Sequence, residues 1–381
     1  MEANGKLKVM TIVGTRPEII RLSRVIAVLD QNVNHILVHT GQNYDYELND
    51  IFFNDLEIRT PDYFLNIDTS SLGSAVGDII KKSEEVLLKV KPDALLVLGD
   101  TNSCISGYMA KRLKIPIYHM EAGNRCFDFN VPEEINRRVI DHLADFNLVY
   151  TEHARRNLIA EGFPLRRIYL TGSPMNEVIE HYKAKINQSS ILNGLALKKS
   201  GYFLVSIHRE ENVENKKNLK ELIYTLQLIS EKYKKPLIFS THPRTRKQLE
   251  KTGDFKRDKK IQFLKPFGFS DYVNLQVNAL CTLSDSGTIS EESAILNFPA
   301  VTVRNAMERP EALDAGSIIL TGINSQAILR AIEMEMNERM QGKIKTVPVD
   351  YQVRNTSQRV VKLILGTCHL SNSWAGIIRN K

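Results

Sequence analysis

The chain has 381 residues, of which 43% are hydrophobic and 25% are charged, and its formal net charge is +7. At roughly 100–200 residues per domain, this length predicts two domains that each bury a core. No apolar run approaches the ~18 residues of a membrane span, and the polar residues 1–8 with the brief apolar run 9–13 do not resemble a signal peptide. We therefore expect a globular cytoplasmic protein with no membrane attachment.

The net positive charge and the spacing of the cysteines indicate which partners and metal sites to expect. The lysine pairs of the second half lie far apart and lack interleaved aromatic residues, so a nucleic-acid partner is not expected. An anionic small substrate remains compatible with the charge. The four cysteines form no CxxC pair, which argues against a disulfide framework and a zinc site. They are Cys104, Cys126, Cys281 and Cys368.

Strand-like apolar runs alternate with helix-period segments through the first half of the chain. This order predicts a parallel sheet covered on both faces. The predicted strands are 7–13, 35–40, 94–98, 117–120, 146–150 and 168–171. The predicted helices are 19–29, 46–53, 74–90, 104–113, 132–143 and 152–161.

A polar stretch, 183–200, lacks a strand pattern and precedes a second series of alternating elements, so we place a domain boundary after residue 182. The predicted strands of this series are 202–207, 236–240, 261–264, 280–283 and 300–303. Its predicted helices are 219–233, 244–251, 272–279, 289–296 and 325–340. The prediction is an α/β protein with two Rossmann-like, doubly wound domains facing a cleft, and ligands at the carboxyl ends of the strands.

The first predicted strand ends in Gly14-Thr15-Arg16-Pro17-Glu18. Gly14 permits a tight turn, and proline is favoured at the start of a helix. Arg16 and the helix N-terminus could together hold a phosphate, although an ordinary turn with a surface arginine has the same sequence. The GxGxxG fingerprint is absent, so NAD is not indicated.

Carboxylates follow two further strands of the first half. Asp100 and Glu121 come directly after apolar runs, and Glu133 lies four residues before Arg137 in a predicted helix. Each has an ordinary alternative: Asp100 as a helix cap, Glu121 in a structural ion pair, and Glu133 with Arg137 as a helix-surface pair. Three carboxylate-bearing loops at one sheet edge nevertheless favour a catalytic site.

The second half places cations and hydroxyl groups after its strands. His208 and Arg209 follow one strand, and His242 follows the next. The run Ser286-Gly287-Thr288 leads into a helix that carries Glu292, an arrangement suited to an anion and a ribose. Structural histidines and simple capping by Ser286 are the alternatives.

Eight motifs, in this order and spacing, resemble the non-hydrolysing UDP-N-acetylglucosamine 2-epimerase family. They are GTRPE, GDTNS, HMEAGNR, PEEINR, HREEN, THPR, SDSGTISEE and ERPEALDAG. The resemblance implies a glycosyltransferase-B-like fold, with domains 1–182 and 183–356 and a C-terminal helix in 357–381 that crosses back to the first domain. It also implies a homodimer, a UDP-linked N-acetylated sugar as substrate, and no cofactor or obligatory metal.

The resemblance also assigns roles to residues that match the motifs. The implied catalytic set is Asp100, Glu121, Glu133, Arg137 and His208. The implied UDP contacts are Arg16, Arg21, His208, Arg209, His242, Ser286, Gly287, Thr288, Glu292 and Arg309.

Two segments depart from the family pattern. The segment 121–133, EAGNRCFDFNVPE, is short and resembles the branch that converts UDP-2-acetamido-2,6-dideoxy-L-talose to UDP-N-acetyl-L-fucosamine for surface polysaccharides. The segment 40–46 replaces a run that some members use for activation by substrate. A UDP-N-acetylglucosamine 2-epimerase, a retaining glycosyltransferase and a non-catalytic UDP-sugar sensor remain alternatives. The tail 366–381 matches no pattern.

Overall fold

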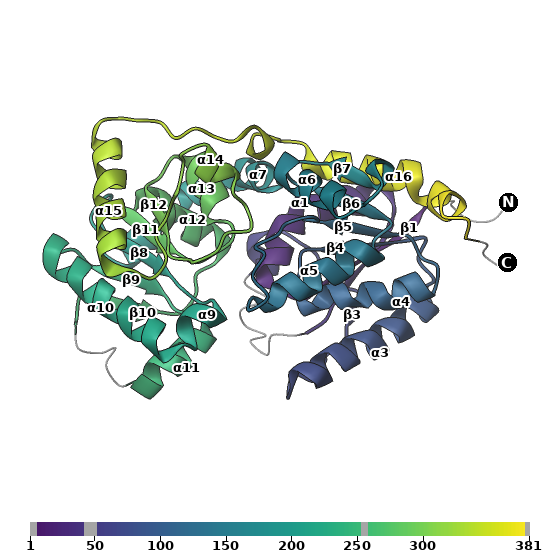
Figure 1. Cartoon of the computed structure of the whole chain (residues 1–381), viewed down its shortest axis with the longest axis horizontal. Coiled ribbons are helices and arrows are strands. Elements are labelled where there is room, and N and C mark those ends of the chain that lie inside the picture. The colour runs from purple at the N-terminus through teal and green to yellow at the C-terminus, as the bar shows by residue number, and fades with distance from the viewer. Residues whose placement is uncertain (1–5, 42–51, 253–257, 378–381) are drawn as a thin grey trace. The chain divides into compact units, whose positions relative to one another are not determined.

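The computed structural model describes residues 6–41, 52–252 and 258–377. The chain divides into two compact units, one formed by Met1–His181 with Asp350–Lys381 and the other by Tyr182–Val349 (Figure 1). The predicted second domain extended to residue 356, but 350–356 belong to the first unit. The reason is local, because Asp350 accepts hydrogen bonds from the backbone amides of Glu152 (3.0 Å) and Ser173 (3.2 Å).

The first unit contains a seven-stranded parallel sheet in the order β3-β2-β1-β4-β5-β6-β7. The chain progresses in one direction from β1 to β3 and in the other from β4 to β7, as in a doubly wound fold. The strands are β1 (Lys8–Val13), β2 (Asn34–His39), β3 (Tyr63–Phe64), β4 (Ala94–Leu98), β5 (Ile117–Met120), β6 (Phe146–Val149) and β7 (Ile168–Leu170).

Helices cover both faces of this sheet, so its central strands are buried throughout. The helical elements are α1 (Arg16–Asn32), α3 (Leu72–Val90), η1 (Asn102–Ile105), α4 (Ser106–Arg112), α5 (Pro132–Leu143), α6 (Glu152–Ala160), η2 (Leu165–Arg167), α7 (Met175–Gln188), η3 (Val349–Tyr351) and α16 (Thr356–Trp374). The predicted helix 46–53 and the segment 40–46 lie largely outside the described residues.

The C-terminal segment returns to the first unit as α16, which packs on α1. Most of the unassigned tail 366–381 is therefore helical. The Trp374 ring lies edge-on to Phe146 of β6, with 6.2 Å between ring centroids, and its carbonyl accepts a hydrogen bond from Arg166.

The second unit contains a six-stranded parallel sheet in the order β10-β9-β8-β11-β12-β13. Its strands are β8 (Phe203–Ser206), β9 (Leu237–Ser240), β10 (Ile261–Leu264), β11 (Cys281–Ser284), β12 (Ala300–Thr302) and β13 (Ile319–Leu320). Its helices are α8 (Ile191–Gly194), α9 (Glu210–Val213), α10 (Lys216–Tyr233), α11 (Pro243–Thr252), α12 (Phe269–Asn278), α13 (Ile289–Leu296), α14 (Glu311–Asp314) and α15 (Ser325–Met340).

The predicted fold class, two Rossmann-like parallel-sheet domains, is confirmed. The sequence missed β3 and β13, because strands of two residues are too short for a periodic pattern. The polar stretch 183–200 is partly helical, since it contains the end of α7 and all of α8. All four cysteines are free thiols. Among the described residues, no helix is long and apolar enough to cross a bilayer.

Candidate functional site

Two predicted carboxylates lie at the carboxyl edge of the first sheet. Strands β4 and β5 pair in register, with Leu98 opposite Met120, so Asp100 and Glu121 leave the sheet side by side. Asp100 accepts a hydrogen bond from Arg137 Nε (3.1 Å) and pairs with Arg137 Nη2. Asp100 is therefore an ion-pair partner and not a helix cap, since the cap of η1 is Thr101.

Glu121 has an unusual backbone conformation, with a φ of 65°. The left-handed region is costly for a residue with a side chain, and such strain is concentrated at functional sites. Its carboxylate pairs with Arg21 Nη1, which connects a predicted catalytic group to a predicted UDP contact. A Cβ on Gly99 would lie 3.0 Å from Glu121 Oε2, so glycine is required there both for its φ of +73° and for space.

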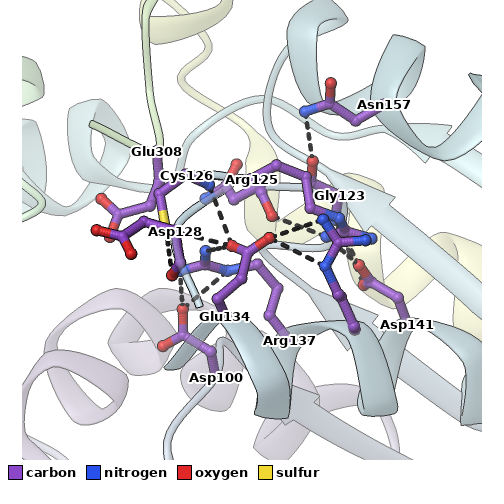
Figure 2. Close-up of polar contacts among 12 residues, drawn as sticks. Asp100, Gly123, Arg125, Cys126, Asp128, Glu134, Arg137, Asp141, Asn157 and Glu308 are labelled. Carbon is purple, nitrogen blue, oxygen red and sulfur yellow. Dashed lines mark hydrogen bonds and ion pairs between the residues drawn. The ribbon is translucent and has the colours of Figure 1, made fainter. Parts of the chain in front are cut away.

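Arg137 faces the sheet edge instead of the surface of α5. It is 3% exposed and donates through Nη1 to Glu134 (2.8 Å) while its other nitrogens contact Asp100, as Figure 2 shows. The structure thus places Glu134 as a partner of Arg137 on this helix. Glu133 is half-buried in the first turn of α5.

Glu134 also fixes the segment that follows Glu121. Its carboxylate accepts hydrogen bonds from the Cys126 amide (3.1 Å) and from Arg138 Nε (3.0 Å). Burial alone would raise the pKa of Glu134, but the Cys126 amide and the charge of Arg137 hold the pKa below its usual value. Sequence reasoning did not select Glu134, although its i,i+3 and i,i+4 spacing to Arg137 and Arg138 could have indicated it.

A second buried carboxylate, that of Asp141, fixes the loop that follows β5. It accepts hydrogen bonds from Arg125 Nη1 (2.7 Å) and the Gly123 amide (3.2 Å), as Figure 2 shows. It also accepts one from His119 Nδ1 (2.8 Å). Despite complete burial, the hydrogen bond from His119 and the charges of His119 and Arg125 keep the pKa of Asp141 below its usual value. Asp141 was not predicted, because a lone aspartate late in a helix gives no signal in the sequence.

Glu18 connects the β1–α1 loop to the loop after β4. It accepts hydrogen bonds from the Gly14 amide (3.1 Å) and Thr15 Oγ1 (2.7 Å), and Ser103 Oγ donates to its other oxygen. Arg16 lies at the start of α1, with its guanidinium 5.4 Å from the centroid of the Phe52 ring. A helix N-terminus with an arginine can hold a phosphate, as predicted for this loop.

In the second unit, Asp285 organises the predicted His208 and Arg209. Its buried carboxylate accepts hydrogen bonds from the backbone amides of both residues (3.0 and 2.9 Å) and from Asn212 Nδ2 (3.0 Å), and His208 Nδ1 lies 3.2 Å away. Burial opposes the charged form, but these donors lower the pKa of Asp285 to about 2. Arg209 also pairs with Glu308 (3.2 Å).

The N-terminus of α13 lies beside this cluster. Ser286 Oγ accepts a hydrogen bond from the amide of Thr288 (3.3 Å), the N-cap residue, whose own side chain makes no cap hydrogen bond. A Cβ on Gly287 would lie 3.7 Å from Arg209 Nη2. The loop thus presents hydroxyl groups and amides near a guanidinium, which suits an anion.

Three further predicted UDP contacts lie in the second unit. Glu292 accepts a hydrogen bond from Gln276 (2.6 Å), and Arg309 forms a buried ion pair with Glu291 (2.6 Å). The His242 ring centroid is 6.0 Å from that of His208. Within the described ranges, no group of three histidine, cysteine or acidic side chains is arranged to hold a metal ion.

Charged side chains gathered at the carboxyl edge of each doubly wound sheet define the class: an α/β enzyme of the nucleotide-binding type. The family model for UDP-N-acetylglucosamine 2-epimerase matches residues 27–365. The chain belongs to this family of isomerases.

Three relatives illustrate the similarity. The structure of UDP-N-acetylglucosamine 2-epimerase from Rickettsia bellii is 50% identical, with a TM-score of 0.90, covering 96% of this chain and 98% of that one. The Methanocaldococcus jannaschii UDP-GlcNAc 2-epimerase, solved in complex with UDP-GlcNAc and UDP, is 36% identical, with a TM-score of 0.89 and coverage of 94% and 100%. UDP-2,3-diacetamido-2,3-dideoxy-D-glucuronate 2-epimerase from Pseudomonas aeruginosa is 33% identical over 88% of this chain and 94% of its own length.

Proposed function

We propose that this protein inverts C2 of a UDP-linked N-acetylated sugar by eliminating UDP and adding it back. The observation that carries the proposal is the pair of carboxylates, Asp100 and Glu121, at adjacent strand ends in a member of this epimerase family. Each of the two carboxylates pairs with an arginine, Glu121 with Arg21 and Asp100 with Arg137.

The chemistry explains why carboxylates and cations are needed together. The hydrogen on C2 is not next to a carbonyl group, so a base cannot remove it directly. If the anomeric C–O bond breaks and UDP leaves with the electron pair, the ring becomes oxocarbenium-like and the C2 proton becomes acidic. A base then takes that proton and leaves a 2-acetamidoglycal.

The reverse steps give the epimer. An acid returns a proton to C2 from the opposite face, and the UDP oxygen bonds again to C1, so no water is consumed. Asp100, Glu121 and Glu133 are proposed to share the proton transfers and to stabilise the positive ring, with Arg137 holding Asp100. Arg16, Arg21, His208, Arg209, His242, Ser286, Gly287, Thr288, Glu292 and Arg309 are proposed to hold UDP.

We propose UDP-2-acetamido-2,6-dideoxy-L-talose as the substrate and UDP-N-acetyl-L-fucosamine as the product. The support is the form of the segment 121–133. The second candidate, UDP-N-acetylglucosamine, is favoured by the names of the Rickettsia and Methanocaldococcus relatives. The Pseudomonas relative is named for a third sugar at 33% identity, so family membership leaves the sugar open.

The test is incubation with each UDP-sugar in D2O, followed by proton NMR. We expect turnover of the L-talo sugar, with deuterium at C2 of the product and no net release of UDP. Product without deuterium at C2 would contradict the elimination mechanism, and preferential turnover of UDP-N-acetylglucosamine would assign the second candidate.

The carboxylates are tested by substitution. Asp100→Asn, Glu121→Gln and Glu133→Gln should each lower kcat by roughly 10²–10⁴-fold, as expected for loss of an acid or base, while UDP binding changes little. Glu152→Gln, at a more exposed carboxylate in the first turn of α6, is the control and should retain activity. Wild-type turnover that is unchanged in all three variants would contradict the roles given to these carboxylates, whereas UDP binding without turnover in the wild-type protein would favour a non-catalytic UDP-sugar sensor.

A further inference from the structure

Asp285 occupies a position that the parallel pairing of two strands creates. Strands β8 and β11 are neighbours in the second sheet (Figure 1), with Ser206 opposite Ser284. The chain therefore leaves both strands at the same edge, and the Asp285 amide continues the pairing by donating to Ser206 O (3.2 Å). This brings Asp285, one residue past β11, against His208, two residues past β8.

The contacts of Asp285 fix its charge. Three donors converge on its carboxylate, namely the amides of His208 and Arg209 and Asn212 Nδ2, and His208 Nδ1 lies 3.2 Å from the same group. Each contact requires an acceptor, and an ionised carboxylate is acceptor-only. The side chain of Asp285 is fully buried, whereas that of His208 is 39% exposed, so the carboxylate lies behind a ring that reaches solvent.

We propose that Asp285 is a positioning residue that fixes the tautomer and orientation of His208, with Nδ1 as the protonated nitrogen and Nε2 left for the substrate. This inference rests on the proposed function, in which His208 contacts UDP. In the neutral tautomer that results, Nε2 carries the lone pair, so it can accept a hydrogen bond or a proton from the bound UDP-sugar.

The same carboxylate orients the backbone of Arg209. Arg209 Nε donates to the carbonyl of Asp285 (3.0 Å), so one residue holds both predicted UDP contacts from β8. A single aspartate thereby sets the direction of an imidazole and of a guanidinium, and preorganised groups of this kind need no rearrangement at the moment of reaction.

The experiment measures the tautomer directly. Two-bond ¹⁵N–¹H correlation spectra of the full-length protein with ¹⁵N-labelled histidine resolve the two ring nitrogens of its nine histidines. The His208 signals are assigned by their loss in His208→Gln. At a pH where the ring is neutral, we expect the proton on Nδ1 in the wild-type protein and on Nε2 in Asp285→Asn.

Kinetics supply the second measurement. Asp285→Asn should lower kcat by about 10²-fold or more, because His208 then presents the wrong nitrogen, while the Kd for UDP changes by less than about tenfold. Asn212→Ala removes one donor from the same carboxylate without touching the imidazole. It controls for loosening of the loop, and it should keep the Nδ1 proton and most of the turnover.

Three results would overturn the inference. They are an Nε2 proton on neutral His208 in the wild-type protein, an unchanged tautomer in Asp285→Asn, and a loss of kcat in Asn212→Ala as large as in Asp285→Asn. The wild-type spectrum needs no variant of Asp285, so it decides the tautomer even if that variant does not fold. Absence of turnover on every UDP-sugar would reject the proposed function and leave the tautomer measurement valid.

Discussion

At position 18 a carboxyl group is buried among amide and hydroxyl donors. Its burial is the largest influence on its ionisation and raises the pKa above the usual value of 4.5, although the hydrogen bonds from Ser103, Thr15 and the Gly14 amide act in the opposite direction. A carboxyl group with a raised pKa stabilises the folded state fully below pH 4.5. This stabilisation is lost as the pH rises through the pKa of the group in the folded state. Ionisation of Glu18 as the pH rises therefore costs stability.

Glu18→Gln should accordingly be tolerated at pH 7. The amide carbonyl can accept from Gly14 and Thr15, its NH2 group can donate to Ser103, and no charge is buried. We expect the free energy of unfolding to be unchanged or higher by about 1 kcal/mol, whereas Glu18→Ala should lower it by roughly 1–3 kcal/mol because donors lose their acceptor. Urea unfolding at pH 7 measures both, and a Gln variant less stable than the Ala variant would contradict the argument.

Residue types at the site could be predicted more readily than their pairings. Asp100 and Glu121 were predicted because polar residues after apolar strands mark the carboxyl edge of a parallel sheet. Helical spacing allows both Glu133 and Glu134 to reach Arg137, and the contact with Glu134 was not predicted, because it depends on packing. The left-handed conformation of Glu121 had no signal in the sequence, since nothing in the residue type requires it.

At the scale of elements, α16 shows how one helix contributes to the first unit. One face carries Val360, Val361, Ile364 and Cys368, all buried, while its neighbour Leu365 is 43% exposed. Burial of the first face against the body of the unit supplies the hydrophobic stabilisation that a C-terminal segment needs to stay ordered.

Ile364→Ala should therefore lower the free energy of unfolding by about 2–5 kcal/mol, since it leaves a cavity under the helix. Leu365→Ala removes a side chain of similar size from the exposed face and is expected to change stability by less than about 1 kcal/mol. Chemical unfolding of the two variants provides the comparison. Equal losses would show that α16 does not bury the face that contains Ile364.

The long elements followed from periodicity, and their bounds were predicted well where polar breaks were clear, as for α5 and β4. The assignment of Asp350 to the first unit could not be predicted in this way. It depends on hydrogen bonds to Glu152 and Ser173, which are far away in sequence.

At the scale of the whole molecule, buried carboxylates in both units make the free energy of unfolding depend on pH in the acidic range. Asp141 and Glu134 in the first unit and Asp285 in the second have lowered pKa values, because buried donors and cations hold them ionised against the cost of burial. These groups contribute their full stabilisation above the usual pKa values, which are 3.8 for the two aspartates and 4.5 for Glu134. This stabilisation is lost as the pH falls through the pKa of each group in the folded state, which is about 2 for Asp285.

We expect the free energy of unfolding to fall steadily from about pH 5 to pH 2, with Asp285 contributing about 2 kcal/mol of the change. Urea unfolding at a series of pH values measures the fall. In Asp285→Asn the pH dependence should be weaker by that amount. A free energy that stays constant between pH 5 and pH 3 would contradict the ionised state of these groups.

The sequence by itself determined the fold class, the family and most elements, because hydrophobic periodicity and ordered motifs are local properties of the chain. Only the tertiary structure decided which charges meet. Glu134, Asp141 and Asp285 each gather donors from segments that parallel pairing and helix packing bring together, and the energy of those contacts depends on a burial that no local pattern records.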